Sequence, residues 1–153
     1  MEFNVLYEDE KVLVIDKPAG IIVFPEDKTT EKTLIDYLLE KLPYLKKVGK
    51  FPRYGIVHRL DKDTSGILLI AKNNKTLDFL QRKFQTQGVT KKYIALVVGN
   101  LKENRGRIET LIGRSKKDRK KQKVYFPLEP DSKGKRKAIT EYRVLKRFKD
   151  YTL

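Results

Sequence analysis

The chain lacks cysteine, and its 153 residues include only one histidine and one methionine. Without cysteine the protein can form neither a disulfide framework nor a thiolate metal site. A single histidine leaves too few ligands for a structural zinc site, so no metal is expected. No apolar stretch approaches the roughly 20 residues that a membrane-spanning helix requires. Residues 1–10 also lack the basic and apolar regions of a signal peptide. We therefore expect a cytoplasmic protein with no membrane contact.

Acidic residues are scarce relative to basic ones. The chain has 35 Lys and Arg against 20 Asp and Glu, and a net charge of +15. Residues 102–153 hold 18 basic and 7 acidic side chains, so this part carries most of the excess. A solvated, lysine-rich exterior of the thermophile type is the alternative, but it usually comes with matching glutamate. The balance favours nucleic acid over a membrane surface, because the basic runs lack an apolar helical face. The densest stretch contains Arg114, Lys116, Lys117, Arg119, Lys120, Lys121 and Lys123.

Hydrophobic periodicity predicts an α+β domain. Apolar residues at helical spacing predict helices over 33–42 and 76–84, and Thr33 with Asp36 resembles a capping box. Many strands and only two helices indicate a largely antiparallel mixed sheet. The expected strands are 3–7, 12–15, 21–24, 56–57, 67–71, 93–98, 108–112, 123–126 and 138–145.

The run HRLDKDTSG at 58–66 gathers unusual chemistry between two apolar, strand-like segments. It contains the only histidine, two carboxylates, an arginine, two hydroxyls and a glycine. Polar residues held between strands are typical of loops that build functional sites. We therefore treat this run as the candidate site.

Two interpretations of the run fail on the sequence. Residues 61–66 match the first half of an EF-hand calcium loop, but the position that needs a bidentate glutamate is Lys72. A Ser-His-Asp hydrolase would use Ser65 and His58, yet triad members normally come from separate elements. The chain also has no G-x-S-x-G elbow.

Three interpretations stay open from the residues alone. Asp61 and Asp63 could form a glycosidase carboxylate pair, since on a strand they would share a face about 6–7 Å apart. Asp61, kept ionised by the adjacent Arg59, could instead attack a nucleotide or assist at its sugar. The third possibility is an Asx-type turn, in which Asp61 binds loop amides and Gly66 supplies an unusual dihedral angle.

The wider pattern resembles one protein family. The run GIVHRLDKDTSGILLIAK at 55–72 is similar to the central motif of the RluA-type pseudouridine synthases. Three further segments agree in order: DKPAGIIV at 16–23, KKYIALVVG at 91–99 and KAITEY at 137–142. The resemblance covers nearly the whole chain and implies the pseudouridine synthase catalytic fold, which is α+β.

The resemblance also implies an activity. Members of the family isomerise uridine in structured RNA, either rRNA or tRNA, to pseudouridine without cofactor or metal. The N-glycosidic bond breaks, the uracil turns, and C5 is rejoined to C1′ of the ribose. The family's catalytic aspartate corresponds to Asp61, which either attacks C1′ or removes a proton from C2′. Asp63 is then a loop or surface carboxylate.

Further roles follow from the same resemblance. Tyr93 corresponds to a tyrosine that lies against the uracil, although a core strand tyrosine is the alternative. A uridine in folded RNA must be flipped out of its stack, and Arg59 could fill the gap or bind phosphate. Alternatively, Arg59 forms an ion pair with a loop acid. His58 is expected to orient the loop by hydrogen bonds.

Other residues are expected to support the loop or the RNA. Thr64, Ser65 and Gly66 are expected to brace the loop that carries Asp61, and Lys17 with Pro18 to shape a neighbouring loop. The basic stretch 114–123 is expected to contact RNA phosphates and to make binding sensitive to salt.

Two family features are missing from this sequence. Family catalytic domains continue into a G-R-x-H-Q-I-R-x-H motif whose arginine pairs with the catalytic aspartate, and that motif is absent. The upstream accessory RNA-binding domain of many members is absent as well. We therefore expect residues 1–153 to form a single, C-terminally incomplete catalytic domain, and a monomer. The alternative is a non-catalytic RNA-binding fragment or module of this fold.

Overall fold

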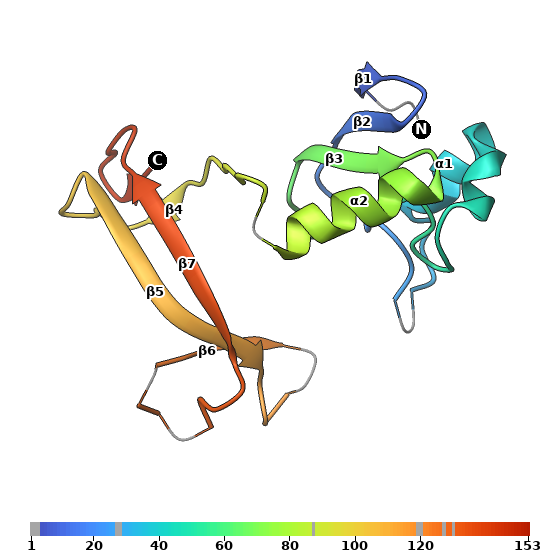
Figure 1. Ribbon diagram of the computed structural model, residues 1–153. Coiled ribbons are helices and arrows are strands. Elements are labelled where there is room, and N and C mark those ends of the chain that lie inside the picture. Colours follow the sequence, from blue (N-terminus) through green and yellow to red (C-terminus); the bar gives the residue numbers. More distant parts are fainter. Residues whose placement is uncertain (1–3, 27–28, 87, 119–120, 127, 130) are drawn as a thin grey trace. The chain divides into compact units, whose positions relative to one another are not determined.

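The computed structural model describes residues 4–26, 29–86, 88–118, 121–126, 128–129 and 131–153. The chain divides into two compact units, Met1–Lys91 and Lys92–Leu153, shown in Figure 1. This division is finer than the single domain that the sequence predicts. Charge follows it: the second unit holds 19 basic and 7 acidic residues, a net charge of +12, against +3 for the first.

The first unit contains a three-stranded antiparallel sheet in the order β1-β2-β3. Its strands are β1 (Asn4–Glu8), β2 (Val12–Lys17) and β3 (Gly66–Ala71), which confirms three of the predicted strands. Alternate residues of β2 are buried, as expected for a strand with one face on the core. Ile56 forms an isolated bridge to Ile70, and the amide of Val57 donates to the carbonyl of Leu69 (3.2 Å). The predicted strand at 56–57 is therefore reduced to a short pairing with β3.

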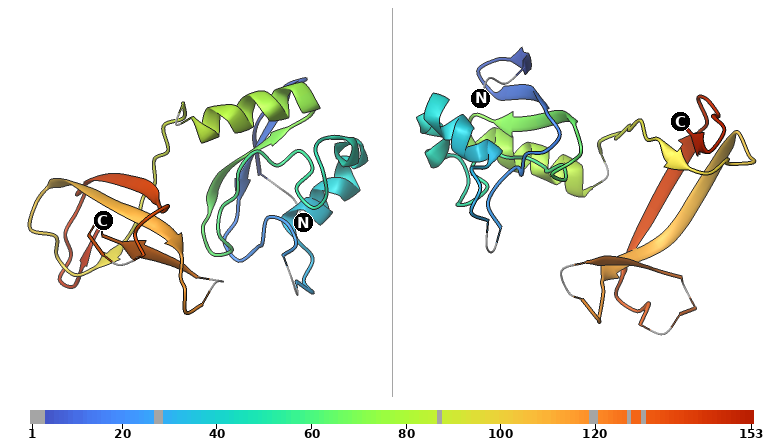
Figure 2. Two further views of the ribbon diagram at one scale, coloured as in Figure 1. Left: turned by 60° about the horizontal axis from the view of Figure 1, so that its bottom comes forward. Right: turned by 180° about the vertical axis from the view of Figure 1, so that it is seen from behind.

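Two helices and one 3-10 helix complete the first unit. They are α1 (Leu34–Lys41), α2 (Asn74–Gln85) and η1 (Pro43–Lys47), so both predicted helices are confirmed. The Asp36 carboxylate accepts hydrogen bonds from the backbone N–H (2.8 Å) and hydroxyl (2.7 Å) of Thr33, which stabilises the start of α1. Helix α2 packs beside β3, as Figures 1 and 2 show.

The predicted strand at 21–24 is wrong. Ile21, Val23 and Phe24 are buried and Ile22 is half-buried, but the backbone of this segment pairs with the start of α1 instead of a sheet. The amides of Leu34 and Ile35 donate to the carbonyls of Ile22 (2.8 Å) and Val23 (2.9 Å). Because the first N–H groups of a helix have no partner within it, this segment satisfies two of them. The side chains of Ile21, Val23 and Phe24 pack in the same hydrophobic core as those of α1.

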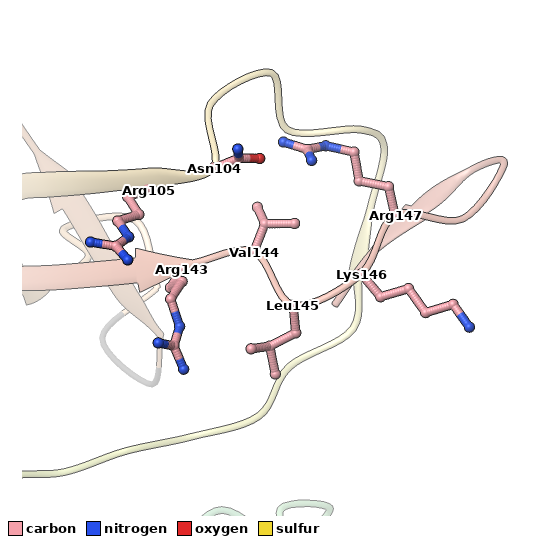
Figure 3. A pocket seen from close by; sticks show the side chains of 7 residues that line it. All are labelled: Asn104, Arg105, Arg143, Val144, Leu145, Lys146 and Arg147. Carbon is pink, nitrogen blue, oxygen red and sulfur yellow. The ribbon is translucent and has the colours of Figure 1, made fainter.

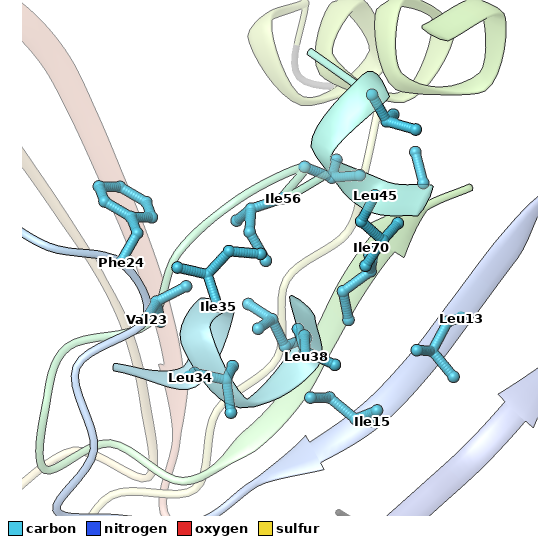
Figure 4. Packing of buried hydrophobic residues seen from close by; sticks show 14 of the residues in the cluster. Leu13, Ile15, Val23, Phe24, Leu34, Ile35, Leu38, Leu45, Ile56 and Ile70 are labelled. Carbon is cyan, nitrogen blue, oxygen red and sulfur yellow. The ribbon is translucent and has the colours of Figure 1, made fainter. Parts of the chain in front are cut away.

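The hydrophobic core of the first unit lies between the sheet and α1 (Figure 4). Side chains from the sheet, from α1 and from η1 meet there with almost no exposure to solvent. The most deeply buried hydrophobic members are Ile15, Leu34, Ile35, Leu38, Leu45, Ile56, Leu68 and Ile70. This core anchors β3, and the candidate loop ends where β3 begins.

The second unit is built from two small antiparallel sheets. One has the order β6-β5-β7 and the other pairs β4 with β8. In Figure 2, β5 and β7 form a long ribbon. Its strands are β4 (Val97–Val98), β5 (Arg105–Arg114), β6 (Gln122–Tyr125), β7 (Arg136–Arg143) and β8 (Tyr151–Thr152). Every strand pair among the described residues is antiparallel, which agrees with the α+β expectation.

The predicted strand at 93–98 is mostly wrong. Only Val97 and Val98 pair with another strand, β8, and that strand has just two residues. Residues 93–96 are exposed, so their apolar pattern does not mark a buried strand here. No helix among the described residues is long and apolar enough to cross a membrane.

The core can be tested with two isoleucines on the same strand. Ile70 of β3 is fully buried, whereas Ile67 is 60% exposed. We expect Ile70→Ala to lower the free energy of unfolding by about 2–5 kcal/mol, because it leaves a cavity. The matched variant Ile67→Ala should cost about 1 kcal/mol or less. Urea denaturation followed by circular dichroism measures both, and equal losses would contradict the burial of this strand.

Candidate active site

The run 58–66 forms a turn that leads into β3. The amide of Thr64 donates to the carbonyl of Asp61 (3.2 Å) and closes the turn. Leu60 is buried on one side of this turn, whereas Asp61 and Asp63 are exposed. The loop is therefore anchored by an apolar side chain at one end and by the sheet at the other.

Lys17 forms the floor beneath this loop. Its side chain is fully buried, and its ammonium donates to the carbonyls of Pro18 (2.8 Å), Ile21 (2.9 Å) and Lys62 (3.0 Å). The carbonyl of Lys62 accepts a second hydrogen bond, from the amide of Gly20 (2.8 Å). Lys17 and Gly20 thus tie the loop after β2 to the centre of the turn that carries Asp61.

The charge of Lys17 is balanced by the turn itself. Burial lowers the pKa of the Lys17 ammonium below its usual 10.5, while the negative charges of Asp63 and Asp61 oppose the shift. The sequence predicted that Lys17 shapes a neighbouring loop, but not that its ammonium reaches across to Lys62. The negative charges of Asp61 and Asp63 favour the protonated form of Lys17, the buried cation beneath the turn.

Arg59 and Lys62 hold the outer side of the loop. Arg59 forms an ion pair with Glu26 and lies over the ring of Phe24, 5.0 Å from its centroid. Lys62 forms an ion pair with Glu31 (3.0 Å). For Arg59, the structure contains the loop-acid ion pair that the sequence left as the alternative to an RNA role. No sequence pattern indicated Glu26 or Glu31 as partners, because both lie in a separate, polar segment.

His58 is a hydrogen-bond acceptor within the loop. Its Nε2 accepts from the amide of Leu69 (3.3 Å), and its ring stacks on Phe84 with centroids 4.6 Å apart. Burial lowers the pKa of His58 below its usual 6.5, and the backbone of Arg59 partly opposes this shift. The side chain joins the loop to β3 and α2. Its role in orienting the loop stays a prediction.

The Asp61 carboxylate is exposed. Within the described part of the chain it accepts no hydrogen bond and forms no ion pair, although its charge acts on Lys17. The Asx-type turn is therefore wrong, because the backbone carbonyl of Asp61 closes the turn. An Asx-type arrangement does occur at Asp9, whose carboxylate accepts from the amides of Lys11 and Val12 (both 2.7 Å).

The other interpretations of the run lose their geometric basis. Residues 62 and 63 lie in a turn, so the strand spacing assumed for a glycosidase pair does not apply. Lys72, which occupies the position where a calcium loop needs a glutamate, donates to Glu8 (2.8 Å). Among the described residues, no three His, Asp or Glu side chains cluster as metal ligands. His58 uses Nε2 for Leu69, which leaves no support for a Ser65 triad.

The remaining loop residues support the turn through the backbone. Thr64 contributes its amide, and neither its hydroxyl nor that of Ser65 makes a hydrogen bond among the described residues. Gly66 has φ of +129°, a conformation that side chains rarely adopt, and it pairs with Lys17 at the start of β3. The Pro18 carbonyl accepts from Lys17. The bracing roles of Thr64, Ser65 and Gly66 stay predictions.

The other predicted residues lie in the second unit. Tyr93 is 65% exposed and precedes β4. Lys116 forms an ion pair with Asp131, Lys121 pairs with Asp118 (3.7 Å), and Lys123 lies over the ring of Tyr125. Lys117 and Arg114 are exposed, and Arg114 ends β5. Arg119 and Lys120 lie outside the described residues. The RNA roles of Tyr93 and of this stretch stay predictions.

Comparison with known proteins identifies the family. The RNA pseudouridylate synthase family model matches residues 11–153, and the chain belongs to this family. A ribosomal large subunit pseudouridine synthase D from Borreliella burgdorferi is 45% identical over 152 residues, covering 97% of this chain and 44% of that protein. An uncharacterized RNA pseudouridine synthase from Aquifex aeolicus is 42% identical over 150 residues, covering 98% of this chain and 45% of that protein.

A solved structure shares the fold. Human RNA pseudouridylate synthase domain containing 1 has a TM-score of 0.74 at 24% identity, over 99% of this chain and 57% of that chain. The chain spans about half the length of the curated relatives that it matches. The family and the fold that the motifs imply are thus confirmed.

Replacement of Lys17 tests its place beneath the loop. Lys17→Met keeps an unbranched side chain of nearly the same length but leaves the carbonyls of Pro18 and Ile21 without their donor. We expect a loss of about 1–3 kcal/mol in the free energy of unfolding, with faster hydrogen exchange at the Gly20 amide. Lys62→Met, which removes only an exposed ion pair, should cost about 0–1 kcal/mol. Matching losses and exchange rates in the two variants would argue against the tether.

The lowered pKa of His58 predicts a pH dependence. Between that pKa and 6.5 the unfolded chain binds more protons than the folded chain, so the free energy of unfolding rises with pH. Stability should therefore fall as pH is lowered from about 7 towards about 5. Because the chain has one histidine, His58→Gln isolates the effect, and its stability should change less over this range. Urea denaturation at several pH values measures this difference, and identical profiles for both proteins would contradict a lowered pKa of the half-buried His58.

Proposed function

We propose that the protein isomerises uridine in large-subunit ribosomal RNA to pseudouridine, with Asp61 as the reacting carboxylate. The observation that carries the proposal is the exposed, unpaired carboxylate of Asp61 on a turn tied down by Lys17. Membership of the RNA pseudouridylate synthase family supplies the reaction class. Relatives from Borreliella burgdorferi and Pseudomonas aeruginosa are named ribosomal large subunit pseudouridine synthase D, which supports the RNA class.

Asp63 is the natural competitor for this role. It is exposed on the same turn, and within the described residues it too forms no ion pair. The preference for Asp61 comes from the HRLD motif, in which the family's aspartate falls at this position. Asp61 also directly follows Leu60, whose burial fixes the backbone at that point.

The reaction needs one bond to break and one to form. The bond between N1 of uracil and C1′ of the ribose is cleaved, and C5 of uracil bonds to C1′. A proton leaves C5, and N1 gains a proton. An exposed carboxylate can assist as a nucleophile at C1′ or as a base at C2′. Either route requires the carboxylate to keep its position while the uracil turns, which is the task of Lys17 and His58.

The rest of the chain would bind the RNA. A uridine in folded RNA must leave its stack before a carboxylate can reach its sugar. The second unit, with its net charge of +12, would hold the phosphate backbone, and Tyr93 would contact the uracil. Arg59 would serve RNA only after exchanging Glu26 for a phosphate.

Asp61→Asn tests the proposal against its matched neighbour, Asp63→Asn. The substrate is unmodified large-subunit ribosomal RNA transcribed with tritium at C5 of uridine, because isomerisation releases that tritium to water. We expect Asp61→Asn to reduce release at least about a hundredfold, while Asp63→Asn keeps most of the wild-type rate. Filter binding should show that both variants still bind the RNA.

Two outcomes would overturn the proposal. Undiminished release by Asp61→Asn would remove Asp61 from the chemistry. RNA binding by the wild-type protein without any tritium release would favour the alternative, a non-catalytic RNA-binding module of the same fold.

A further inference from the structure

Charges alternate in sign across β5 and β7. Arg107 lies opposite Glu141 in the strand register, and their side chains form an ion pair (3.6 Å). Arg107 also contacts Glu109 (3.2 Å), and Glu109 pairs with Lys137 on β7. Opposite charges on facing strands stabilise a sheet and help to fix its register. The ribbon is therefore held in part by complementary charge.

This pattern fails at one end of the ribbon. Arg105, the first residue of β5, lies directly opposite Arg143, the last residue of β7. Side chains in such positions have Cβ atoms about 4.5–5.5 Å apart, and like charges there are destabilising. A protein that otherwise pairs opposite charges along these strands has two arginines at facing positions here.

A pocket of about 440 Å³ opens at the same end of the ribbon. It is lined by seven residues, none of them acidic, and Figure 3 shows Arg105 and Arg143 on neighbouring strands. The lining residues are Asn104, Arg105, Arg143, Val144, Leu145, Lys146 and Arg147. The pocket therefore presents four cations and no compensating carboxylate.

The cations of the pocket have two different roles. Arg147 donates through Nε to the carbonyl of Leu101 (2.9 Å) and through Nη2 to that of Lys102 (3.1 Å), so it builds the wall. Lys146 lies over the ring of Phe148, 5.1 Å from its centroid. Arg105 and Arg143 form no ion pair with any residue that the structure describes. The charge of these two arginines is available to an anion from outside the chain.

We propose that this pocket binds a phosphodiester group of the RNA backbone, between the guanidinium groups of Arg105 and Arg143. Guanidinium binds phosphate through paired N–H donors, and a shared phosphate would turn the repulsion between these arginines into attraction. The volume lies in the range of small-molecule sites, about 300–1,000 Å³, and exceeds the needs of one phosphate. RNA as the source of the phosphate rests on the proposed function, and the site is separate from the basic stretch 114–123.

Arg105→Gln and Arg143→Gln test the pocket, with Arg107→Gln as the matched control. Binding of the protein to a short fluorescein-labelled RNA hairpin is followed by anisotropy over a salt series. We expect each pocket variant to bind several-fold more weakly, with a salt slope shallower by about 0.7–0.9. Arg107→Gln removes the same charge from the same strand, but its partners are Glu109 and Glu141, so affinity and slope should change little.

Thermal unfolding without RNA provides a second measurement. Arg143→Gln should keep or raise the melting temperature because it removes a repulsion, whereas Arg107→Gln should lower it. Wild-type affinity and salt slope in both pocket variants would overturn the proposal. Free inorganic phosphate at constant ionic strength should compete with the RNA more strongly for the wild-type protein than for the pocket variants, because the same guanidinium groups would bind both. These measurements do not depend on isomerisation. A failure of the proposed activity would therefore not overturn the phosphate site, and a failure of the phosphate site would not overturn the proposed activity.

Discussion

The arrangement of the first unit depends on one buried cation, the ammonium of Lys17. Burial of a charge is costly unless hydrogen bonds and opposite charges compensate it. Here three carbonyls accept from the ammonium, and the charges of Asp61 and Asp63 act on it from the turn above. The chain on each side of this cation therefore cannot move without leaving it unsatisfied. The position of the Asp61 loop follows from the end of β2.

The cations around the turn make two kinds of contact, one with the backbone of the turn and the other with carboxylates outside it. Lys17 lies beneath the turn and binds its backbone, while Arg59 and Lys62 reach outward to Glu26 and Glu31. Their charges are satisfied away from the aspartate. This leaves the Asp61 carboxylate exposed without an ion pair among the described residues. A carboxylate in this state can react with a ligand without first breaking a strong contact.

The sequence predicted the elements whose side chains face a core with a regular period, namely β2, β3, α1 and α2. It could not predict the conformation of segment 21–24, since the backbone there pairs with the start of α1 instead of with a strand. It identified Asp61 and Lys17 by motif, but the contact from Lys17 to Lys62 depends on the register that pairs Lys17 with Gly66. The partners Glu26 and Glu31 depend on where a polar loop passes, which periodicity does not specify.

The two units are stabilised by different forces. The first has a core of fully buried side chains, which salt hardly affects. Among the described residues of the second unit only Tyr125 and Thr152 are buried, so its strands rely on backbone pairing and on cross-strand charges. Solvent-exposed charge pairs weaken as salt rises. A unit organised in this way gains from a polyanion, because phosphates can neutralise the cations that its own carboxylates leave unpaired. The proposed reacting group, Asp61, lies in the unit stabilised by burial, and most of the excess positive charge lies in the unit stabilised by strand and charge pairing.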